Sequence, residues 1–329
     1  MSILVTGGAG YIGSHMVLEL LDSGETVIVL DDLSTGFAWA VPRDATFVRG
    51  DAGDPALVLR LIAEHGIDTI AHFAAKIVVP DSVADPLGYY LSNTVKSRNL
   101  IEAAVRGGVR RFIFSSTAAV YGNPRENPVS EDAVADPVSP YGRSKLMTEW
   151  MLADASRAHG LRHVALRYFN VAGADARGRS GQSTPRATHL VKVAVQTALG
   201  QRPYLEVLGT DYPTKDGSCV RDYIQVTDLA RAHLCALEHL RAGGDSLTLN
   251  CGYGRGFSVL EVVEVVKKVS GVDFKVMRSP RRLGDPAAIV AKADRIRAEL
   301  GWTPEHDDLA QIVAQALAWE KRLIDQRAA

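Results

Sequence analysis

The stretch SILVTGGAGYIGSH, residues 2–15, decides the fold. Residues 2–6 are short, apolar and partly β-branched, which predicts a buried strand, and residues 16–21 have the apolar periodicity of a helix. Between them Gly7, Gly10 and Gly13 follow the spacing G-x-x-G-x-x-G. Glycine permits the tight turn, lets the backbone approach a pyrophosphate and lets the helix pack closely on the strand. This order predicts a dinucleotide-binding unit with its phosphates at the helix N-terminus.

A carboxylate at the end of the next strand narrows the choice of dinucleotide. Residues 26–30 form the second predicted strand and Asp31 follows it, roughly 20 residues after the glycines, as the dinucleotide pattern requires. A carboxylate there suits the 2′-OH of the adenosine ribose and repels a 2′-phosphate. We therefore predict NAD rather than NADP. Its neighbour Asp32 either joins this site or caps the following loop.

Tyr141 and Lys145 stand four residues apart in SPYGRSK, residues 139–145, at the start of another predicted helix. This spacing places both side chains on one helix face, one turn apart. A phenol has a reference pKa of about 10, and a neighbouring ammonium lowers that pKa by favouring the phenolate. Such a pair can take a proton from an alcohol carbon that loses hydride. The spacing is common by chance, so the pair gains its meaning from the predicted hydride acceptor.

The composition is that of an ordinary globular enzyme. Of the 329 residues, 47% are hydrophobic and 23% charged, which allows one large or two closely packed domains. The net charge of −1 gives no electrostatic basis for binding nucleic acid or an anionic membrane, and no apolar run is long enough to span a bilayer. Because the chain opens directly into a strand, we expect no signal peptide. Cys219, Cys235 and Cys251 fit reduced thiols in a cytoplasm better than a disulfide framework or a zinc site, and no metal site is predicted.

Strand and helix patterns alternate along the first half of the chain. The predicted strands cover residues 2–6, 26–30, 46–51, 69–75, 111–116 and 163–167, and the later helices cover residues 57–64, 85–107 and 141–159. This order predicts an α/β fold with a doubly wound parallel (Rossmann) sheet. Ligands of such sheets bind at the carboxyl ends of the strands, where Asp31, Asp51, residues 73–75 and residues 115–117 fall.

The pattern changes after about residue 170. Residues 173–184 are polar and glycine-rich, which predicts a loop. Residues 220–225 are a predicted strand and residues 228–240 a predicted helix that returns to the first domain; a strand over 246–251 and helices over 258–269, 292–300 and 307–324 follow. We expect an NAD-binding domain over residues 1–170, with a return segment at about 220–240, and a smaller C-terminal α/β substrate domain over the rest of residues 171–329.

Together these residues resemble the extended short-chain dehydrogenase/reductase family and, more narrowly, its UDP-glucose 4-epimerases. The resemblance covers nearly the whole chain. The glycine block, the SPYGRSK block and residues 115–122 are typical of nucleotide-sugar enzymes in general. GTDYPT at residues 209–214 and RDYI at residues 221–224 are more specific to the epimerases, and further matching blocks are residues 72–75, 167–170 and 281–286.

The resemblance implies NAD-dependent inversion at C4 of UDP-sugars, with UDP-glucose and UDP-galactose interconverted through a transient 4-keto sugar. It implies an isomerase of galactose metabolism with tightly bound NAD and a UDP-sugar as its partner. It also implies a homodimer formed through the helices over 85–107 and 141–159. Tyr141 would be the base, Lys145 its electrostatic partner and a ribose ligand, and Thr117 the hydroxyl that binds the sugar oxygen.

The remaining site residues are carried over from the same resemblance. Arginine forks match phosphate geometry, so Arg221 and Arg282, with Asn170, would hold the diphosphate. Asp285 would hold the uridine ribose, and residues 205–208 would line the uracil pocket. The implied cofactor-binding set is Gly7, Gly10, Tyr11, Ile12, Gly13, Asp31, Asp32, Asp51, Ala52, Phe73, Ala74, Ala75, Asn93, Ser115, Tyr141, Lys145 and Tyr168. The implied substrate-binding set is Thr117, Tyr141, Asn170, His189, Leu190, Leu205, Glu206, Val207, Arg221, Tyr223, Arg282 and Asp285.

Structural roles stay open for several of these residues. Arg221 could form an ion pair with its neighbour Asp222, Thr117 could be a cap, and Asn170 could belong to a turn. Of the two adjacent arginines, Arg281 and Arg282, one could be exposed to solvent without a binding role.

Four positions depart from the family pattern, so their roles stay open: Lys76, His189, Gln225 and Ile289. Ile289 stands four residues after Asp285, where some members carry Tyr beside the sugar ring. A smaller aliphatic side chain leaves more room. We therefore expect some tolerance for N-acetylhexosamine substrates.

The same residues argue against several rival functions. A 4,6-dehydratase or decarboxylase would need acids beside Thr117, where Ala118 and Ala119 stand. Asp31 opposes an NADP-dependent keto-sugar reductase, and the presence of both Tyr141 and Lys145 opposes a non-catalytic NAD sensor. Nothing in the sequence separates hexose from pentose, so a UDP-xylose/UDP-arabinose 4-epimerase is the alternative.

Overall fold

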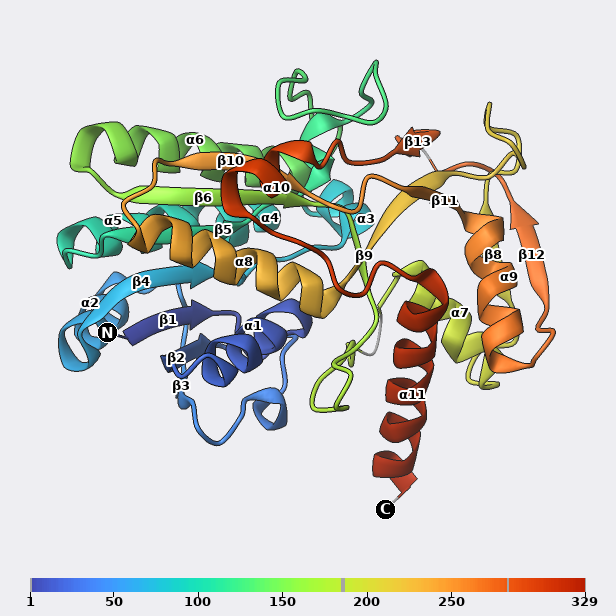
Figure 1. The fold of residues 1–329 in the computed structure, drawn as a ribbon, viewed down its shortest axis with the longest axis horizontal. Coiled ribbons are helices and arrows are strands. Elements are labelled where there is room, and N and C mark those ends of the chain that lie inside the picture. Colours follow the sequence, from blue (N-terminus) through green and yellow to red (C-terminus); the bar gives the residue numbers. More distant parts are fainter. Residues whose placement is uncertain (1, 185–186, 283, 329) are drawn as a thin grey trace.

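A seven-stranded parallel sheet forms the centre of the computed structural model, which describes residues 2–184, 187–282 and 284–328 (Figure 1). The strand order is β3-β2-β1-β4-β5-β6-β10, and all neighbours are parallel. The bounds are β1 Ser2–Thr6, β2 Thr26–Asp31, β3 Thr46–Arg49, β4 Ile67–His72, β5 Arg111–Ser115, β6 Arg162–Tyr168 and β10 Leu247–Cys251. The order reverses between β1 and β4, and ligands of such sheets bind at this switch point. The predicted fold class is confirmed.

Helices cover both faces of this sheet. On one face α1 (Tyr11–Asp22), α8 (Val226–Arg241) and α10 (Asp294–Leu300) pack together, and Figure 1 shows α1 and α8 side by side. On the other face lie α2 (Pro55–His65), α5 (Lys96–Arg106) and α6 (Pro140–His159). Successive strand residues point to opposite faces, so Val5 belongs to the core under α1 and α8, whereas Leu4 belongs to the core under α2 and α5.

The helix predicted over residues 85–107 is divided. It consists of α4 (Pro86–Tyr89), a π-helical turn over Tyr90–Val95 and α5. A short helix, α3 (Val79–Ala84), precedes it and was not predicted. The π-helical turn contains Asn93, whose side chain binds the backbone of Lys76 in both directions, at 2.8 and 2.9 Å. π-Helical turns of this kind are frequent at functional sites.

The remaining elements form a second group around β9 (Val220–Gln225). β9 pairs in parallel with β7 (Asn170–Ala172) and β13 (Ala288–Ile289), and antiparallel with β11 (Gly256–Ser258). A separate parallel pair is formed by β8 (Leu205–Leu208) and β12 (Val276–Ser279). The helices of this group, α7 (Leu190–Ala198), α9 (Val259–Ser270) and α11 (Leu309–Ala328), pack on one another.

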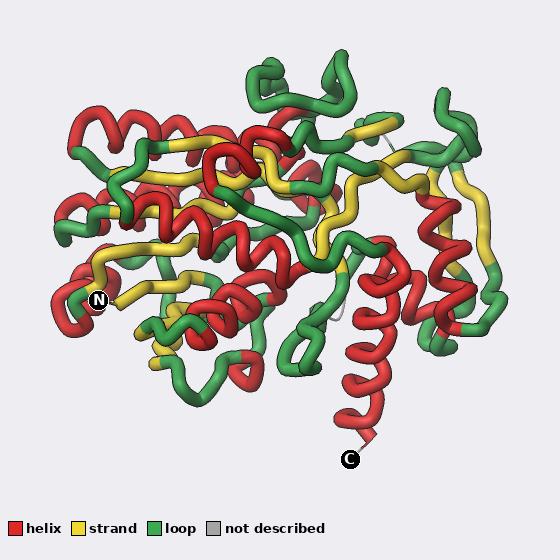
Figure 2. The backbone as a smooth tube through the Cα atoms, viewed as in Figure 1, coloured by secondary structure: helices red, strands yellow, loops and turns green. Residues whose placement is uncertain are grey.

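The chain crosses between the two groups of elements more than once. After β9 it returns as α8, which lies on α1, and continues into β10, the seventh strand of the main sheet. The return therefore extends past residue 240, and the domain boundaries themselves stay a prediction. Figure 2 shows the long loop over residues 122–139 between the short helix Ala118–Tyr121 and α6; a second short helix, Ala38–Ala40, follows β2. Among the residues described, no helix has the length and apolar character needed to cross a bilayer.

Candidate functional site

The glycine loop before α1 is packed so closely that side chains cannot enter it. A Cβ on Gly13 would lie 2.1 Å from the Gly7 carbonyl oxygen, and a Cβ on Gly7 would lie 2.5 Å from the Ala74 nitrogen. Gly10 is the N-cap of α1, and no side chain among the described residues caps the first turn. Free backbone N–H groups at a helix N-terminus bind anions. The loop therefore fits the pyrophosphate of a dinucleotide.

The two acids after β2 have different surroundings. Asp31 is 7% exposed, and its carboxylate accepts hydrogen bonds from Ala9 N at 3.0 Å and Leu33 N at 2.8 Å. Burial raises the pKa of this carboxyl, and the two hydrogen bonds act in the opposite direction. Asp31 is thereby fixed against the glycine loop. Asp32 is exposed and accepts from Ser34 N at 2.8 Å, the loop cap that was one of its two expected roles.

The other residues predicted to line the cofactor surround the ends of β1, β3 and β4. Phe73 N and Ala74 N both donate to the carbonyl of Thr6 at the end of β1, at 2.9 and 3.1 Å, and Ala75 follows in the same loop. The Phe73 ring lies 4.8 Å from the His233 ring, between centroids. After β3, Asp51 binds Lys96 at 2.6 Å, and the half-buried Ala52 packs on the α2–α5 core. These residues therefore lie at the carboxyl edge of the sheet, as predicted.

The predicted catalytic residues meet at the ends of β5 and β6. Lys145 Nζ donates to the carbonyl of Ser115 at 2.9 Å and lies 4.9 Å from the centroid of the Phe114 ring. The Thr117 side chain is close enough to the Tyr141 phenol to lower its pKa. Thr117 also accepts from Ala119 N at 3.1 Å, so it is a cap as well. The Ser115 and Tyr168 hydroxyls are 2.8 Å apart.

Burial has the largest effect on the pKa of both members of the pair. It raises the pKa of Tyr141 above its usual value, and the neighbouring Thr117 side chain lowers that pKa. It lowers the pKa of Lys145 to about 7, while nearby Glu149 raises it. Burial therefore opposes the expected effect of the ammonium on the phenol, and the charge on Lys145 itself depends on pH near neutrality.

A buried ion pair beneath this cluster was not predicted. Glu149 and Arg167 form it, with 2.6 Å between Arg167 Nη2 and Glu149 Oε2. Ser116 Oγ donates to Glu149 Oε1 at 2.5 Å. Glu149 follows Lys145 by four residues, and this spacing could have placed it on the same helix face. Its partner on β6 has no local signal.

The proposed diphosphate end is built from arginines around Asp285. Arg282 Nε lies 3.2 Å from Asp285 Oδ2, and Arg221 Nη2 lies 3.8 Å from Asp285 Oδ1. The alternative of an ion pair between Arg221 and Asp222 is wrong. The Asp222 carboxylate instead accepts hydrogen bonds from the backbone of Tyr253, Gly254 and Ala291, at 3.0, 2.9 and 3.2 Å.

Each of the two adjacent arginines has an acidic partner, so the expectation that one of them is simply solvated is wrong. Arg281 binds Asp211 at 2.7 Å and lies 4.2 Å from the centroid of the Tyr212 ring. Arg282 binds Asp285, and Leu283, the residue after Arg282, lies outside the described residues.

The remaining predicted substrate residues divide into two kinds. Leu205 and Val207 are each 1% exposed and face the core, whereas Glu206, between them, is exposed and accepts from Ser279 Oγ at 2.5 Å. A uracil pocket that used the side chains of Leu205 and Val207 would therefore require them to leave the core. Asn170 begins β7 opposite the buried Tyr223 of β9, so the turn alternative for Asn170 is wrong.

A pocket lies next to the glycine loop, between the two groups of elements. Tyr11 donates its hydroxyl hydrogen bond to the Gly173 carbonyl at 2.7 Å, and Ile12 is the next residue of α1. The N-cap of α7 is His189, whose Nδ1 has no partner among the described atoms, and Leu190 is the first residue of that helix. The pocket is lined by Tyr11, Val171, Ala172, Gly173, Gln182, His189, Val191, Lys192, Ala316 and Trp319.

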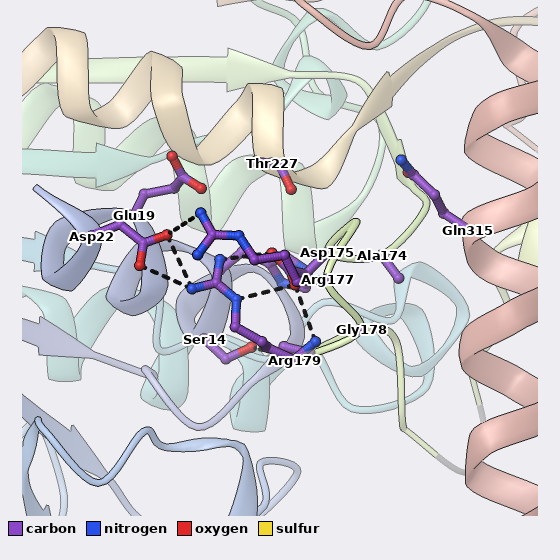
Figure 3. Close-up of polar contacts among 12 residues, drawn as sticks. Ser14, Glu19, Asp22, Ala174, Asp175, Arg177, Gly178, Arg179, Thr227 and Gln315 are labelled. Carbon is purple, nitrogen blue, oxygen red and sulfur yellow. Dashed lines mark hydrogen bonds and ion pairs between the residues drawn. The ribbon is translucent and has the colours of Figure 1, made fainter.

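The predicted loop over residues 173–184 is held against α1 by charges (Figure 3). Asp22 of α1 binds Arg177 at 3.1 Å and Arg179 at 3.0 Å, and Arg179 also binds Asp175 at 2.8 Å. Gln225 donates to the carbonyl of Ala174 in the same loop at 2.9 Å and caps α8 through its side-chain oxygen. This assigns structural contacts to Gln225, a position that departs from the family pattern.

Comparisons with known proteins agree with this arrangement. A family model described as "NAD dependent epimerase/dehydratase family" matches residues 3–252. The UDP-glucose 4-epimerase of Azospirillum brasilense is 56% identical over 321 residues, 98% of this chain and 92% of that protein. The crystal structure of UDP-glucose 4-epimerase from Brucella ovis in complex with NAD has a TM-score of 0.94 at 43% identity and covers 96% of this chain and 97% of that one. The structure of the UDP-Glc/GlcNAc 4-epimerase from Campylobacter jejuni has a TM-score of 0.86 at 49% identity, with 98% and 99% covered.

Proposed function

The chain belongs to the NAD-dependent epimerase/dehydratase family, and we propose that it is an isomerase that interconverts UDP-glucose and UDP-galactose by NAD-dependent epimerisation at C4. The observation that carries this proposal is the buried cluster of Thr117, Tyr141 and Lys145 at the carboxyl edge of the sheet. The names of the relatives support this substrate over the pentose alternative.

The cofactor site is assembled from backbone groups and one carboxylate. The N-terminus of α1 would hold the pyrophosphate, and Asp31 would accept hydrogen bonds from the adenosine ribose. When bound, NAD supplies the hydride acceptor and donor for C4 of the sugar. The tight glycine loop and the ion pairs that hold residues 175–179 on α1 support firm retention of the cofactor.

The acid–base work falls to Tyr141. Its phenolate would take the proton of the 4-OH and return it within the same turnover, so one residue serves both faces of the sugar. Thr117 would hold the same oxygen, since its side chain lies beside the Tyr141 phenol. The charge on Lys145 would favour the phenolate against the effect of burial.

The UDP part of the substrate would be held more firmly than the hexose. Arg221 and Arg282 supply guanidinium groups for the diphosphate, with Asp285 as their present partner. The residues proposed at the sugar, Thr117 and Tyr141, carry only hydroxyl groups. This division lets the sugar turn while the nucleotide stays bound.

We further propose a homodimer and a cytoplasmic location. Val83, Leu87 and Leu91 repeat every four residues, and Leu87 and Leu91 are 78% and 55% exposed. Trp150 on α6, which packs beside this segment, is 59% exposed. Such a large apolar patch fits a second copy of the chain. A Leu91→Glu, Trp150→Glu double variant should run as a monomer in light scattering; an unchanged mass would contradict this interface. The free, largely buried cysteines support a reducing compartment.

The experiment that tests the function is incubation of the pure protein with UDP-galactose, UDP-GalNAc and UDP-arabinose without added NAD. Product formation supports an epimerase that retains its cofactor, and the relative rates decide among hexose, N-acetylhexosamine and pentose. A reductase would require a fresh nicotinamide for each turnover. No product from any of the three sugars would contradict the proposal, and Tyr141→Phe provides the inactive control.

A further inference from the structure

Glu149 is a buried acid for which the proposed reaction has no direct use. Its side chain is 6% exposed and that of its partner Arg167 is 9% exposed. Burying two charges costs desolvation energy that their attraction only partly offsets, so such a pair is poor evidence for stability alone. The position of Glu149 indicates another role.

Glu149 is the third member of the helix face that carries Tyr141 and Lys145, at successive spacings of four residues. Its Oε1 accepts the hydrogen bond of Ser116 at 2.5 Å. The two neighbours of Ser116 lie next to the proposed acid–base pair, because the Ser115 carbonyl accepts a hydrogen bond from Lys145 and the Thr117 side chain lies beside the Tyr141 phenol. The Glu149 carboxylate thus holds the middle residue of a tripeptide, and each outer residue of this tripeptide lies next to one member of the acid–base pair.

The far side of the carboxylate is equally fixed. Arg167 binds it through Nε at 3.0 Å and Nη2 at 2.6 Å. The other guanidinium nitrogen of Arg167 donates to the Tyr121 hydroxyl at 3.0 Å, which in turn donates to Asn250 Oδ1 at 2.6 Å. Asn250 Nδ2 donates to the carbonyl of Val129 at 2.9 Å. Since every side chain in this path is bonded on both sides, Glu149 has little freedom to move.

We propose that Glu149, held by Arg167, is a positioning residue for the epimerisation: it fixes residues 115–117 beneath Tyr141 and Lys145, and its negative charge keeps Lys145 protonated. This inference rests on the proposed function only in taking Tyr141 and Lys145 as the acid–base pair.

The electrostatic part follows from the surroundings of Lys145. Burial lowers its pKa to about 7, and Glu149 is the charged group that raises it. His72, from β4, is also near, but burial lowers the pKa of His72 to about 3, so it is neutral at physiological pH. The charge of Arg167 is matched by Glu149. Further titratable groups near this region are the phenols of Tyr89, Tyr121, Tyr141 and Tyr168, the carboxyl group of Glu131 near Tyr121 and the thiol of Cys251 near Tyr168.

The charge can be tested directly on Lys145 in the NAD-loaded protein. In Glu149→Gln labelled with 13C-lysine, the 13Cε resonance of Lys145, assigned with Lys145→Met, should titrate about one pH unit lower than in wild type, since an opposite charge is removed. The alkaline limb of the kcat profile with UDP-galactose should move in the same direction. Asp154→Asn is the matched control, because it removes one carboxylate from the exposed side of the same helix. It should leave both midpoints unchanged.

A second variant separates positioning from charge. Ser116→Ala removes only the hydroxyl that binds Glu149, and it should lower kcat about tenfold with KM unchanged, because residues 115–117 lose the charged hydrogen bond that holds them in place. The Lys145 midpoint should remain at its wild-type value. Wild-type kcat in Ser116→Ala would overturn the positioning role.

Folding failure does not leave the charge role untested. If Glu149→Gln does not fold, the double variant Glu149→Gln, Arg167→Met removes both buried charges, a change that proteins often tolerate. It should still shift the Lys145 midpoint downward, but by less than Glu149→Gln, because the loss of the Arg167 cation opposes the shift. A folded variant with the wild-type Lys145 midpoint would overturn the charge role. The titration does not depend on turnover, so its failure is distinguishable from a failure of the proposed epimerase activity.

Discussion

The two regions proposed to bind phosphate groups, the glycine loop before α1 and the arginines near β9, are built by different means. The glycine loop offers backbone N–H groups and permits no side chain at Gly7 or Gly13. The second region offers guanidinium groups from β9 and from the segment before β13, and these already share the carboxylate of Asp285. The first is one continuous stretch of chain, whereas the second joins residues about sixty positions apart.

This difference teaches where each region is vulnerable. A backbone site depends on the exact path of the chain, so a single methyl group can destroy it. A side-chain site loses affinity in steps as individual hydrogen bonds are removed. The proposed division between retained NAD and exchanging UDP-sugar agrees with this contrast, because the cofactor is never released in an epimerase turnover while the nucleotide sugar must leave.

The largest effect is expected from Gly13→Ala. The added Cβ would lie 2.1 Å from the Gly7 carbonyl oxygen and 2.9 Å from Gly8 Cα, so the loop must open. We expect purified protein without NAD and without epimerase activity, as measured by cofactor content after heat release. Gly24→Ala is the control: no atom lies within 4 Å of its Cβ, and only its φ of +78° opposes the change. Full NAD content in Gly13→Ala would contradict a backbone-built site.

Arg221→Lys should have a smaller and more selective effect. Lysine keeps the charge but loses the fork that binds two phosphate oxygens. The loss of one charged hydrogen bond, about 1.5–3 kcal/mol, corresponds to a rise in KM of about 10–100-fold, with kcat and NAD content nearly unchanged. Arg278→Lys on the exposed face of β12 should leave KM unchanged. A fall in kcat alone would place Arg221 away from the diphosphate.

Asp222, which follows Arg221 on β9, makes the second region sensitive to pH. Burial raises the pKa of Asp222 from 3.8 to about 6. Because this folded-state pKa is above the unfolded value, the contribution of Asp222 to stability is present below about pH 4 and is lost as the pH rises through about 6. Between pH 4 and pH 7 the free energy of unfolding of the wild type should therefore fall by about 2 kcal/mol relative to Asp222→Asn.

Urea unfolding of both proteins at the two pH values measures this difference. Asp273→Asn, an exposed position with a side chain 89% accessible, is the control and should follow the wild type. Parallel pH dependence of Asp222→Asn and the wild type would mean that the buried carboxyl does not titrate in this range.

The contrast between a continuous stretch of chain and a region assembled from distant residues also explains which parts of the fold the sequence could predict. The glycine loop, Asp31 and the first six strands follow from patterns within short windows, and the structure places them at one sheet edge. The strand over residues 246–251 was predicted, but its place beside β6 was not, because parallel pairing has no local signal. The pairs β8–β12 and β9–β13 were missed for the same reason and because they are only two to four residues long.

Within the site, long-range partners account for what was missed. Arg167 follows Glu149 by eighteen residues on a different element, and Asn250 lies far beyond both. Periodicity assigns each of them a face but no partner. The family resemblance placed residues 205–208 at the uracil, whereas strand alternation buries Leu205 and Val207 in the core. Resemblance transfers a segment, and the structure decides which side chains of that segment face outward.

The smallest effect is expected at Ile289. This residue lies in the second region but carries no charge, so it tests the apolar part of that region separately from the arginines. Ile289 is 7% exposed on β13, opposite Arg221 of β9, and the next residue donates to Asn127 Oδ1 at 2.7 Å. A tyrosine would occupy space proposed for an N-acetyl group, so Ile289→Tyr should lower the ratio of kcat/KM for UDP-GalNAc to that for UDP-galactose by about tenfold. Ile289→Leu, which keeps the volume, should leave the ratio unchanged. An unchanged ratio in folded Ile289→Tyr would mean that this position does not determine which sugar size is accepted. An equal rise in KM for both substrates would instead show that β13 acts through Arg221. In that case the charged and apolar parts of the second region act together.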